Sequence, residues 1–146
     1  MSRTNLLGAL PSHHRAPASW AFSADGRRLI VGYGYDEAKA TAEVWQVENV
    51  RKLAVLERSY SSEVSDVALS HDGRTAFPCD QQGTAGIWDV ATHPPQQLAT
   101  LKGHEDWVSA IAFTPDGNTL VSAGYDGVRV WRASSLAEID AAKEAK

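Results

Sequence analysis

The chain has 146 residues, of which 43% are hydrophobic and 22% are charged, and its formal net charge is −4. These proportions are typical of a folded domain, and they exclude collagen, a coiled coil and wholesale disorder. No apolar run approaches the roughly 20 residues that a membrane-spanning helix needs, so we expect no membrane association. The basic residues form no stripe, which argues against a nucleic-acid partner.

Cysteine and motif content narrow the function classes further. The single cysteine, Cys79, excludes an internal disulfide and favours a reducing compartment, so we expect a cytoplasmic protein. The sequence contains no phosphate-binding glycine loop, no serine nucleophile elbow and no zinc-ligand spacing. We therefore expect no enzymatic activity, no cofactor and no metal.

Two features recur along the chain. A hexapeptide of alanine, a large apolar residue, a hydroxyl residue, a variable residue, aspartate and glycine occurs at 21–26, 68–73 and 112–117. Because Asp-Gly between apolar runs favours a tight turn, each copy predicts a β-hairpin. Tryptophans 45, 88 and 131 are spaced at equal intervals of 43 residues. The chain is therefore read as three repeats, approximately 12–57, 58–101 and 102–139, followed by a polar tail at 140–146.

The first two repeats contain recognisable outer strands and two irregularities. Apolar segments at 50–57 and 96–101 predict the fourth strand of the first and second repeats. In the first repeat we expect 36–42 to be an extended loop. In the second repeat, Pro78 lies within the second strand and removes a hydrogen-bond donor, which predicts a weakened or bulged ladder there.

The third repeat is the most regular. Strands are predicted at 107–113, 119–124 and 128–131, and more weakly at 135–139. The segment 107–113 is apolar on both faces, as expected for a strand buried between two packed sheets. Four strands in about 43 residues cannot bury both faces alone, so the repeats must stack on one another. The fold class is therefore all-β, a propeller-like stack of three four-stranded antiparallel blades in one partial-propeller domain.

The third repeat resembles the WD-repeat (beta-transducin-like) family. The resemblance rests on Gly103-His104, the Pro-Asp-Gly turn at 115–117, the spacing of Ser122 and Asp126, and Trp131; the second repeat keeps the dipeptide Trp88-Asp89. It covers roughly residues 12–139. It implies a structural hydrogen-bond network of His104, Ser122, Asp126 and Trp131, which a buried imidazole and carboxylate require in any case.

The resemblance also implies a function. Members present residues on one end of a rigid ring to protein partners, which makes a non-enzymatic protein-interaction scaffold the expected function here. The matching positions are Glu105, Trp107, Tyr125 and Tyr35, with Cys79 as a further candidate. For Trp107, packing between blades is the alternative. A propeller-based enzyme or small-ligand binder, and a structural subunit that only completes a ring, are the alternative functions.

Three blades leave two apolar sheet faces without a neighbour. Such an arc is a fragment of a larger propeller, associates with itself into a six-blade ring, or is completed by another propeller chain. The repeats start close to Met1 and finish before the polar tail, which favours self-association or a split gene. We also expect residues 6–10 to supply an outer strand that closes such a ring.

Overall fold

Antiparallel pairing of neighbouring strands builds the whole fold. The computed structural model describes residues 4–10, 16–34, 41–57 and 63–132. The first blade consists of β1 (Pro17–Phe22), β2 (Arg28–Tyr33), β3 (Thr41–Gln46) and β4 (Arg51–Glu57). The second consists of β5 (Val64–Leu69), β6 (Thr75–Asp80), β7 (Thr84–Asp89) and β8 (Gln96–Lys102). The third consists of β9 (Val108–Phe113), β10 (Thr119–Gly124) and β11 (Gly127–Arg132).

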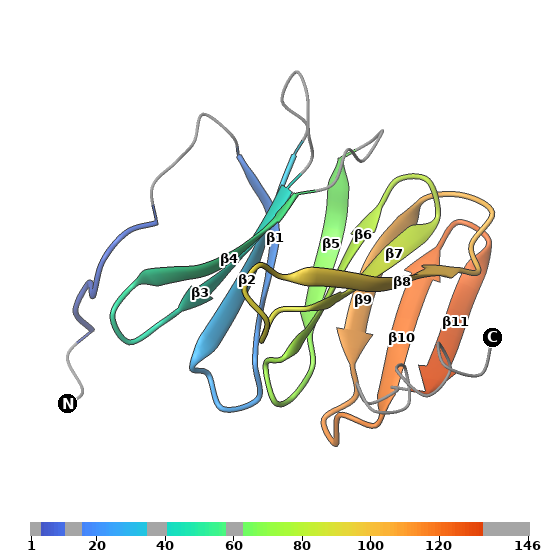
Figure 1. The fold of residues 1–146 in the computed structure, drawn as a ribbon. Helices are drawn as coiled ribbons and strands as arrows, with labels where there is room; N and C mark the ends of the chain where they lie inside the picture. Colours follow the sequence, from blue (N-terminus) through green and yellow to red (C-terminus); the bar gives the residue numbers. More distant parts are fainter. Residues whose placement is uncertain (1–3, 11–15, 35–40, 58–62, 133–146) are drawn as a thin grey trace.

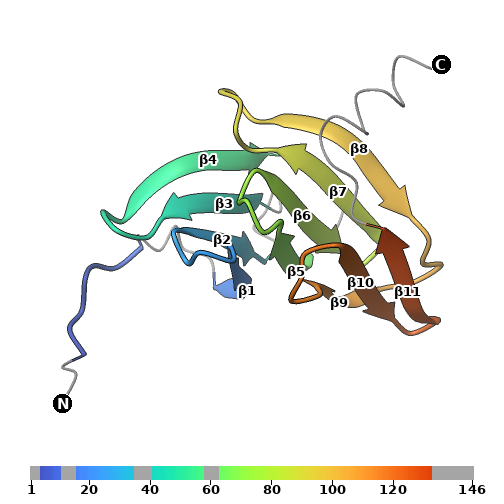
Figure 2. The same ribbon diagram turned by 90° about the horizontal axis from the view of Figure 1, so that it is seen from below.

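Each blade is a simple meander, because strands adjacent in sequence are adjacent in the sheet. The three sheets stand side by side in chain order (Figure 1). Strand β5 packs against both β1 and β9, so the first strand of every blade lies on the inside of the arc. The fourth strands β4 and β8 lie along its outer edge (Figure 2). The expected all-β, propeller-like fold is therefore confirmed.

Most of the predicted strands are present, with one error. The segments 50–57 and 96–101 are β4 and β8. The loop prediction for 36–42 is wrong at its end, because Thr41 and Ala42 begin β3 and pair with β4; its first five residues lie outside the described residues. The weaker strand prediction at 135–139 and the polar tail at 140–146 also lie outside them.

The three Asp-Gly turns are built alike. In each, the hydroxyl residue donates a hydrogen bond to the aspartate, at 2.7 Å for Ser23–Asp25 and 2.6 Å for both Ser70–Asp72 and Thr114–Asp116. The same carboxylate accepts the backbone N–H two residues later, at 2.9 to 3.0 Å. The glycines have φ between 69° and 75°, a conformation that other residues rarely adopt. The repeated hexapeptide thus closes its own hairpin.

Apolar cores fill the two gaps between blades. The first lies between blades one and two and contains Trp88, while the second lies between blades two and three and is bordered by Trp131. In the second core the rings of Phe77 and Phe113 meet edge to face, with centroids 5.2 Å apart. Trp45 lies on the outer side of the first blade, in a cluster with Val31 and Tyr33. Trp88 and Trp131 therefore face the preceding blade, and Trp45 lies on the corresponding side of the first blade.

The equal spacing of the tryptophans has a structural counterpart. Each is the fifth residue of the third strand of its blade. On the second strand they pair with Leu29, Ala76 and Leu120. In the two blades whose fourth strand is described, the ladder to that strand shifts register immediately before the tryptophan. The three indoles thus occupy equivalent positions.

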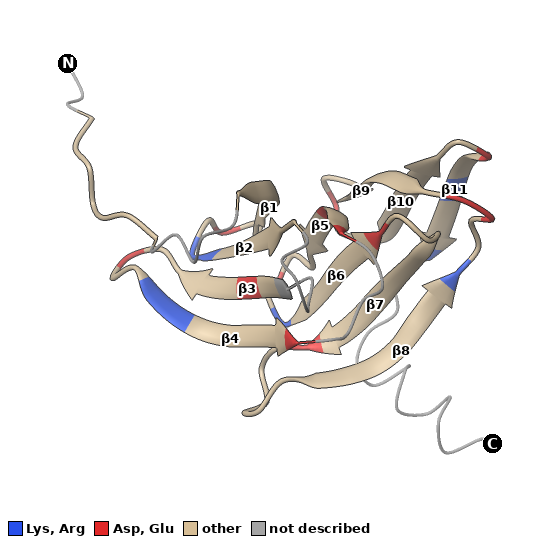
Figure 3. Ribbon diagram, turned by 90° about the horizontal axis from the view of Figure 1, so that it is seen from above, with Lys and Arg blue, Asp and Glu red and all other residues tan. Residues whose placement is uncertain are grey.

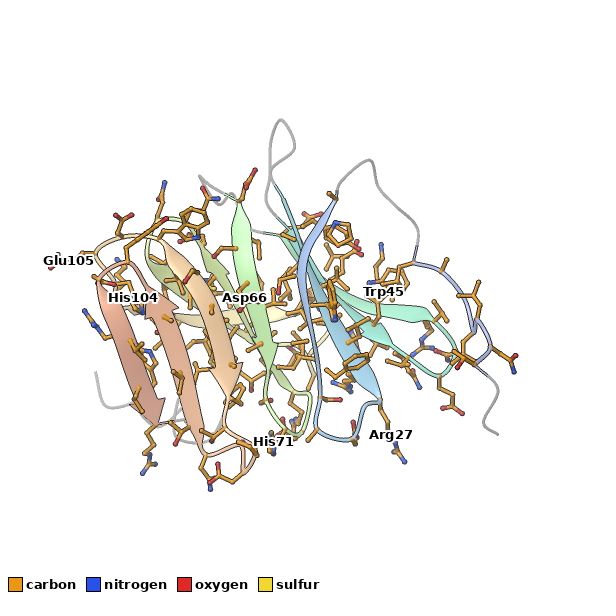
Figure 4. All side chains as sticks on the ribbon, turned by 180° about the vertical axis from the view of Figure 1, so that it is seen from behind. Arg27, Trp45, Asp66, His71, His104 and Glu105 are labelled. Atoms are coloured by element: carbon orange, nitrogen blue, oxygen red, sulfur yellow. The ribbon has the colours of Figure 1, made fainter. Side chains whose placement is uncertain are left out.

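One carboxylate links all three blades at the inside of the arc. Asp66 on β5 accepts a hydrogen bond from the hydroxyl of Ser19 on β1 and one from the backbone N–H of Ile111 on β9, the latter at 2.8 Å. Figure 4 labels Asp66 between its two neighbouring blades. Through these hydrogen bonds Asp66 joins the three inner strands side by side.

The proline in the second blade has the expected effect. Strands β6 and β7 pair through Thr75, Ala76 and Cys79, and the described ladder has no pair at Phe77 or Pro78. On the other side of β6, Pro78 is still opposite Val67. The proline therefore interrupts the ladder with β7, while its pairing with Val67 on β5 is kept.

The N-terminal segment 4–10 forms no strand in this structure, so the outer strand expected at 6–10 is not present within the single chain. Leu10 instead packs against the cluster of Val31, Tyr33 and Trp45. In the described part of the chain, no helix is long and apolar enough to cross a membrane.

Candidate partner-binding face

The candidate face lies at one end of the third blade, where two connections meet. His104 lies in the connection from β8 to β9, and Asp126 lies in the tight turn from β10 to β11. Ser122 points to the same side from β10, and Trp131 from β11, where it is opposite Leu120. Because consecutive antiparallel strands place these segments next to one another, four residues spread over 28 positions converge. Figure 4 labels His104 and Glu105 at this end.

The structure brings all four side chains of the expected network together. His104 Nδ1 lies 2.6 Å from Asp126 Oδ1, and its Nε2 lies 2.7 Å from Ser122 Oγ. The indole N–H of Trp131 donates to the same Ser122 oxygen at 2.9 Å. The side chain of His104 is only 2% exposed. A buried imidazole with both nitrogens paired carries no unsatisfied polar group, so the chain of four is suited to a structural role.

Asp126 anchors the connection that carries Glu105. Its second carboxylate oxygen accepts the backbone N–H of Glu105 at 2.9 Å and a guanidinium N–H of Arg129 at 3.2 Å. The hydrogen bond from His104, the backbone N–H of Glu105 and the charges of His104 and Arg129 lower the pKa of Asp126 to about 2. Asp126 therefore stays ionised at neutral pH and holds the backbone of the face in place.

Two aromatic side chains lie next to the connection that Asp126 anchors. The rings of Trp107 and Tyr125 meet edge to face, with centroids 5.9 Å apart and planes at 63°. Tyr125 is 78% exposed and Trp107 is 36% exposed, and neither belongs to a core between blades. Trp107 thus contacts Tyr125 of its own blade, and its packing between blades stays the alternative prediction. Glu105 is exposed beside them, whereas Tyr35 lies outside the described residues.

The second blade supports the same end of the molecule, which Figure 3 views from above. Gly83, in the turn from β6 to β7, has φ of 82°. A Cβ atom at this position would lie 2.4 Å from the carbonyl oxygen of His104, so only glycine lets the turn approach the His104 connection so closely. Nearby, the amide of Gln81 donates to the carboxylate of Glu63 at 3.2 Å. The turn from β6 to β7 in the second blade thus packs against the His104 connection, and the candidate face extends over both blades.

The first blade contains a second network that the sequence reasoning missed. Glu43, 5% exposed, accepts hydrogen bonds from the hydroxyl of Tyr33 and the indole N–H of Trp45, both at 3.1 Å. Its other oxygen pairs with Lys52 at 3.1 Å, and the ammonium lies 5.4 Å from the centroid of the Trp45 ring. The available signal was a glutamate in the middle of the short apolar strand β3.

This second network also has an electrostatic signature. Burial, followed by the negative charge of Glu43 and the hydrogen bond to it, raises the pKa of Tyr33 to about 12. Trp45, labelled in Figure 4, is thus held by the carboxylate of Glu43 in the first blade. Its counterpart in the third blade, Trp131, is held by Ser122, which is bonded to His104.

The inner side of the arc shows little that supports catalysis. A cavity of about 380 Å³ runs along the first strands of the three blades. Its titratable lining residues are Asp66 and His71, and both oxygens of Asp66 are occupied by neighbouring groups. Among the described residues, no group of three or more His, Cys, Asp or Glu side chains is placed to hold a metal ion.

Three antiparallel meanders stacked around a common inside, with their tryptophans in equivalent places, define a protein of the β-propeller class. The family described as WD domain, G-beta repeat matches residues 95–132, which contain the whole third-blade network. Together with the relatives and solved structures below, this match places the chain in the WD-repeat family.

The relatives are longer proteins. The chain is 32% identical to transcription factor unc-37 of Caenorhabditis elegans over 116 residues, covering 79% of this chain and 18% of that protein. It is 31% identical to protein groucho of Drosophila melanogaster over 109 residues, covering 73% of this chain and 14% of that one. The chain thus spans less than a fifth of the length of these two curated relatives.

Solved structures agree with the fold. A chain of the mitotic checkpoint complex superposes with a TM-score of 0.71 and 27% identity, covering 87% of this chain and 38% of that one. The RRP9 WD40 repeats superpose with a TM-score of 0.69 and 28% identity, covering 85% of this chain and 37% of that one. Both comparisons extend over all the described blades rather than the third repeat alone.

Proposed function

We propose that this protein is a non-enzymatic protein-interaction scaffold, which binds a protein partner through the end of the third blade. The observation that carries the proposal is the exposed pair of Trp107 and Tyr125. Large aromatic side chains held in one orientation lose little conformational entropy on binding, and they are enriched among residues that dominate binding energy. Glu105 adds a negative charge beside them.

The rigidity of the connection that Asp126 anchors supports the same proposal. The backbone N–H of Glu105 is bonded to Asp126, and Asp126 is bonded in turn to the buried His104. The connection that carries Trp107 is therefore fixed before a partner arrives, and little free energy is spent on ordering it during binding. One of the similar solved structures is that of a multi-protein complex, which is consistent with this role.

Affinity capture with matched variants tests the scaffold. The double variant Trp107→Ala/Tyr125→Ala removes the aromatic pair, and Arg27→Ala/Asn118→Ala changes two exposed residues in the Asp-Gly turns at the opposite end. We expect partner proteins to be retained by the wild type and by the turn variant, and lost from the aromatic variant. Equal retention by all three proteins would contradict the proposed face.

We further propose that the three blades form part of a larger ring, completed by further blades. Support comes from β11, where Val128 is 62% and Val130 is 71% exposed on an apolar sheet face. Light scattering of the purified chain over a range of concentrations tests this, because association buries such a face. A strict monomer that binds no complementary propeller chain would contradict it.

A structural subunit that only completes a ring is the second candidate, and it predicts that the aromatic variant captures the same proteins as the wild type. The buried free thiol of Cys79 fits a reducing compartment, and we propose cytoplasmic localisation. Imaging of a fluorescently tagged chain checks that assignment.

A further inference from the structure

We infer that the two outer faces of the three-blade arc are complementary. Two copies of this chain associate head to tail, with the third blade of each against the first blade of the other. The inference rests on the proposed larger ring and names what completes it. For each blade, we call the side toward the following blade its forward face and the opposite side its backward face. The evidence is the chain's own two blade interfaces, which show what covers each position.

The forward face of the third blade is exposed where the other two are buried. Positions two and four of the third strand belong to the forward face in every blade. Exposure there is 0% for Ala42 and Val44 in the first blade, 5% for Ala85 and 8% for Ile87 in the second, and 62% for Val128 and 71% for Val130 in the third. The first two pairs are covered by the next blade, whereas among the described residues no sheet covers the last pair.

The backward face of the first blade is likewise exposed at positions that are buried in the other two blades. Positions four and six of the first strand belong to this face. In the second blade these are Val67, 2% exposed, and Leu69, 4% exposed, and in the third blade Ile111 is 4% exposed. In the first blade the same positions hold Trp20 and Phe22, which are 65% and 55% exposed. In the first blade, two large aromatic residues thus occupy positions that the preceding blade covers in the second and third blades.

The two faces are complementary in size. A Cβ atom on Gly32, at position five of β2, would lie 2.8 Å from Val67, so this forward position packs directly on position four of the next blade's first strand. The third blade has Ala123 at the corresponding forward position, and its neighbouring inner-strand positions are Ala110 and Ala112, both exposed. A forward face lined with alanines leaves room for the ring of Trp20, the largest side chain at the matching backward position.

A hydrogen bond between blades two and three also has an equivalent position in the proposed contact between copies. The hydroxyl of Ser65, at position two of β5, bonds to the carbonyl of Cys79 in its own blade and to that of Val108 in the next blade. Ser109 is the equivalent residue of the third blade, and it bonds to the carbonyl of Ala123, the counterpart of Cys79, at 3.1 Å. The counterpart of the Val108 carbonyl is that of Pro17, the first residue of β1. In the head-to-tail contact, Ser109 thus faces Pro17 of the other copy.

A second copy is favoured over an unrelated occupant because one chain carries both complementary faces. A contact between two different faces of the same molecule is repeated by every copy, and it closes into a ring when the rotation allows. Two arcs of three blades give six blades, within the range of about four to eight that propellers use. That assembly covers Val128 and Val130 of one copy with Trp20 and Phe22 of the other, beside the segment 4–10, whose Leu10 already packs on the backward face of the first blade.

Native mass tests the inference directly. We expect light scattering to give twice the 15.8 kDa of the chain for the wild type. The variant Val128→Glu/Val130→Glu is expected to be monomeric, because it places four charges in the two contacts of the ring; circular dichroism and a melting curve check that it stays folded. The matched control Tyr125→Glu, a charge on an equally exposed residue outside the lateral faces, is expected to remain dimeric.

Cross-linking between copies tests the register. Cysteine is placed at one position in each of two preparations, Ser109→Cys and Pro17→Cys, and the preparations are mixed before a short bismaleimide is added. A covalent dimer is expected from the mixture and from neither preparation alone. A mixture of Tyr125→Cys with Arg27→Cys, at opposite ends of the strands, is expected to remain uncrosslinked. The native Cys79 is 1% exposed and does not compete.

The outcomes separate the two proposals. A monomeric wild type, a dimer insensitive to the charged valine variant, an open series of larger oligomers, or cross-linking of either cysteine variant alone would each overturn the head-to-tail pair. None of these results affects capture of a partner through Trp107 and Tyr125. Conversely, Tyr125→Glu is expected to lose its partner while staying dimeric, so loss of capture without loss of mass tests the scaffold alone.

Discussion

Trp45 and Trp131 occupy the same position in their blades, yet their indole nitrogens end on different acceptors. Trp131 donates to the hydroxyl of Ser122 at 2.9 Å, and Trp45 donates to the carboxylate of Glu43 at 3.1 Å. Burial of an indole requires a partner for its N–H, and the identity of the partner is secondary. The first blade therefore satisfies its tryptophan through the carboxylate of Glu43, where the third uses a hydroxyl bonded to histidine.

The network of the third blade is expected to support stability. Replacing His104 with alanine leaves Ser122 and Asp126 without a shared partner, so we expect the free energy of unfolding to fall by about 2–3 kcal/mol. The matched control, Glu105→Ala, changes the adjacent exposed side chain and is expected to alter it by less than about 0.5 kcal/mol. Urea unfolding followed by tryptophan fluorescence measures both, and equal effects would contradict a supporting role for His104.

Acid is expected to weaken the same blade. The pKa of Asp126 is lowered to about 2 in the folded chain, from about 3.9 in an unfolded one. A lowered carboxyl pKa gives stability that is present above the unfolded pKa and lost as the pH falls toward the folded one. Unfolding free energies measured from pH 5 to pH 2 are therefore expected to fall more steeply in the wild type than in Asp126→Asn. Parallel profiles would argue against this contribution.

Alkali is expected to act on the first blade. The pKa of Tyr33 is raised to about 12, so the folded chain keeps a proton that the unfolded chain releases near pH 10. The unfolding free energy is therefore expected to decline between about pH 10 and pH 12. Tyr33→Phe removes this titration, and its decline over the same interval is expected to be smaller. Denaturant unfolding at several alkaline pH values makes the comparison; identical slopes would disprove the assignment.

Substitutions at two glycines are expected to distinguish the cost of a left-handed backbone from the cost of a steric clash. Gly26 has φ of 69° with open space around a Cβ atom, whereas Gly83 has φ of 82° and a carbonyl oxygen 2.4 Å from that atom. We expect Gly26→Ala to cost about 1–2 kcal/mol for the left-handed backbone alone. Gly83→Ala adds overpacking against the His104 connection and is expected to cost at least about 3 kcal/mol. Thermal unfolding ranks the two, and a similar loss for both would show that the turn yields easily.

Cys79 is expected to be unreactive in the folded chain. Burial, with the negative charges of Asp66 and Asp80, raises the pKa of its thiol to about 12, so the thiol stays protonated at pH 8. We expect the thiol reagent DTNB to label Cys79 only after unfolding in urea. The variant Tyr125→Cys supplies an exposed thiol as the positive control. Rapid labelling of the native wild type at pH 8 would contradict the burial of Cys79 between blades two and three.

Sequence reasoning succeeded where the deciding residues are neighbours in the chain. The hairpins follow from hexapeptides that close on themselves, as Thr114 and Asp116 do. The four residues around His104 were expected together because their spacing resembles that of a known repeat, and that spacing places them on adjacent strands.

What the sequence did not reveal depends on how strands meet. Tyr33 and Glu43 become partners only because β2 and β3 pair and place both side chains on one side of the sheet. Nothing in their spacing distinguishes them from surface residues. The link from Asp66 to Ser19 and Ile111 spans three sheets, so it follows from the stacking of blades rather than from any local pattern.

The Asp-Gly corners have a consequence for how such chains diverge. Each corner draws its closing groups from six consecutive residues, as in Ser70, Asp72 and Thr75. The hydrogen bonds that close a corner of this kind involve no distant residue, although the first two corners also contact each other through Arg28 and the carbonyl of Gly73. Because the closure is local, the second repeat forms the same corner although it has Arg58-Ser59-Tyr60 where the third has Gly103-His104.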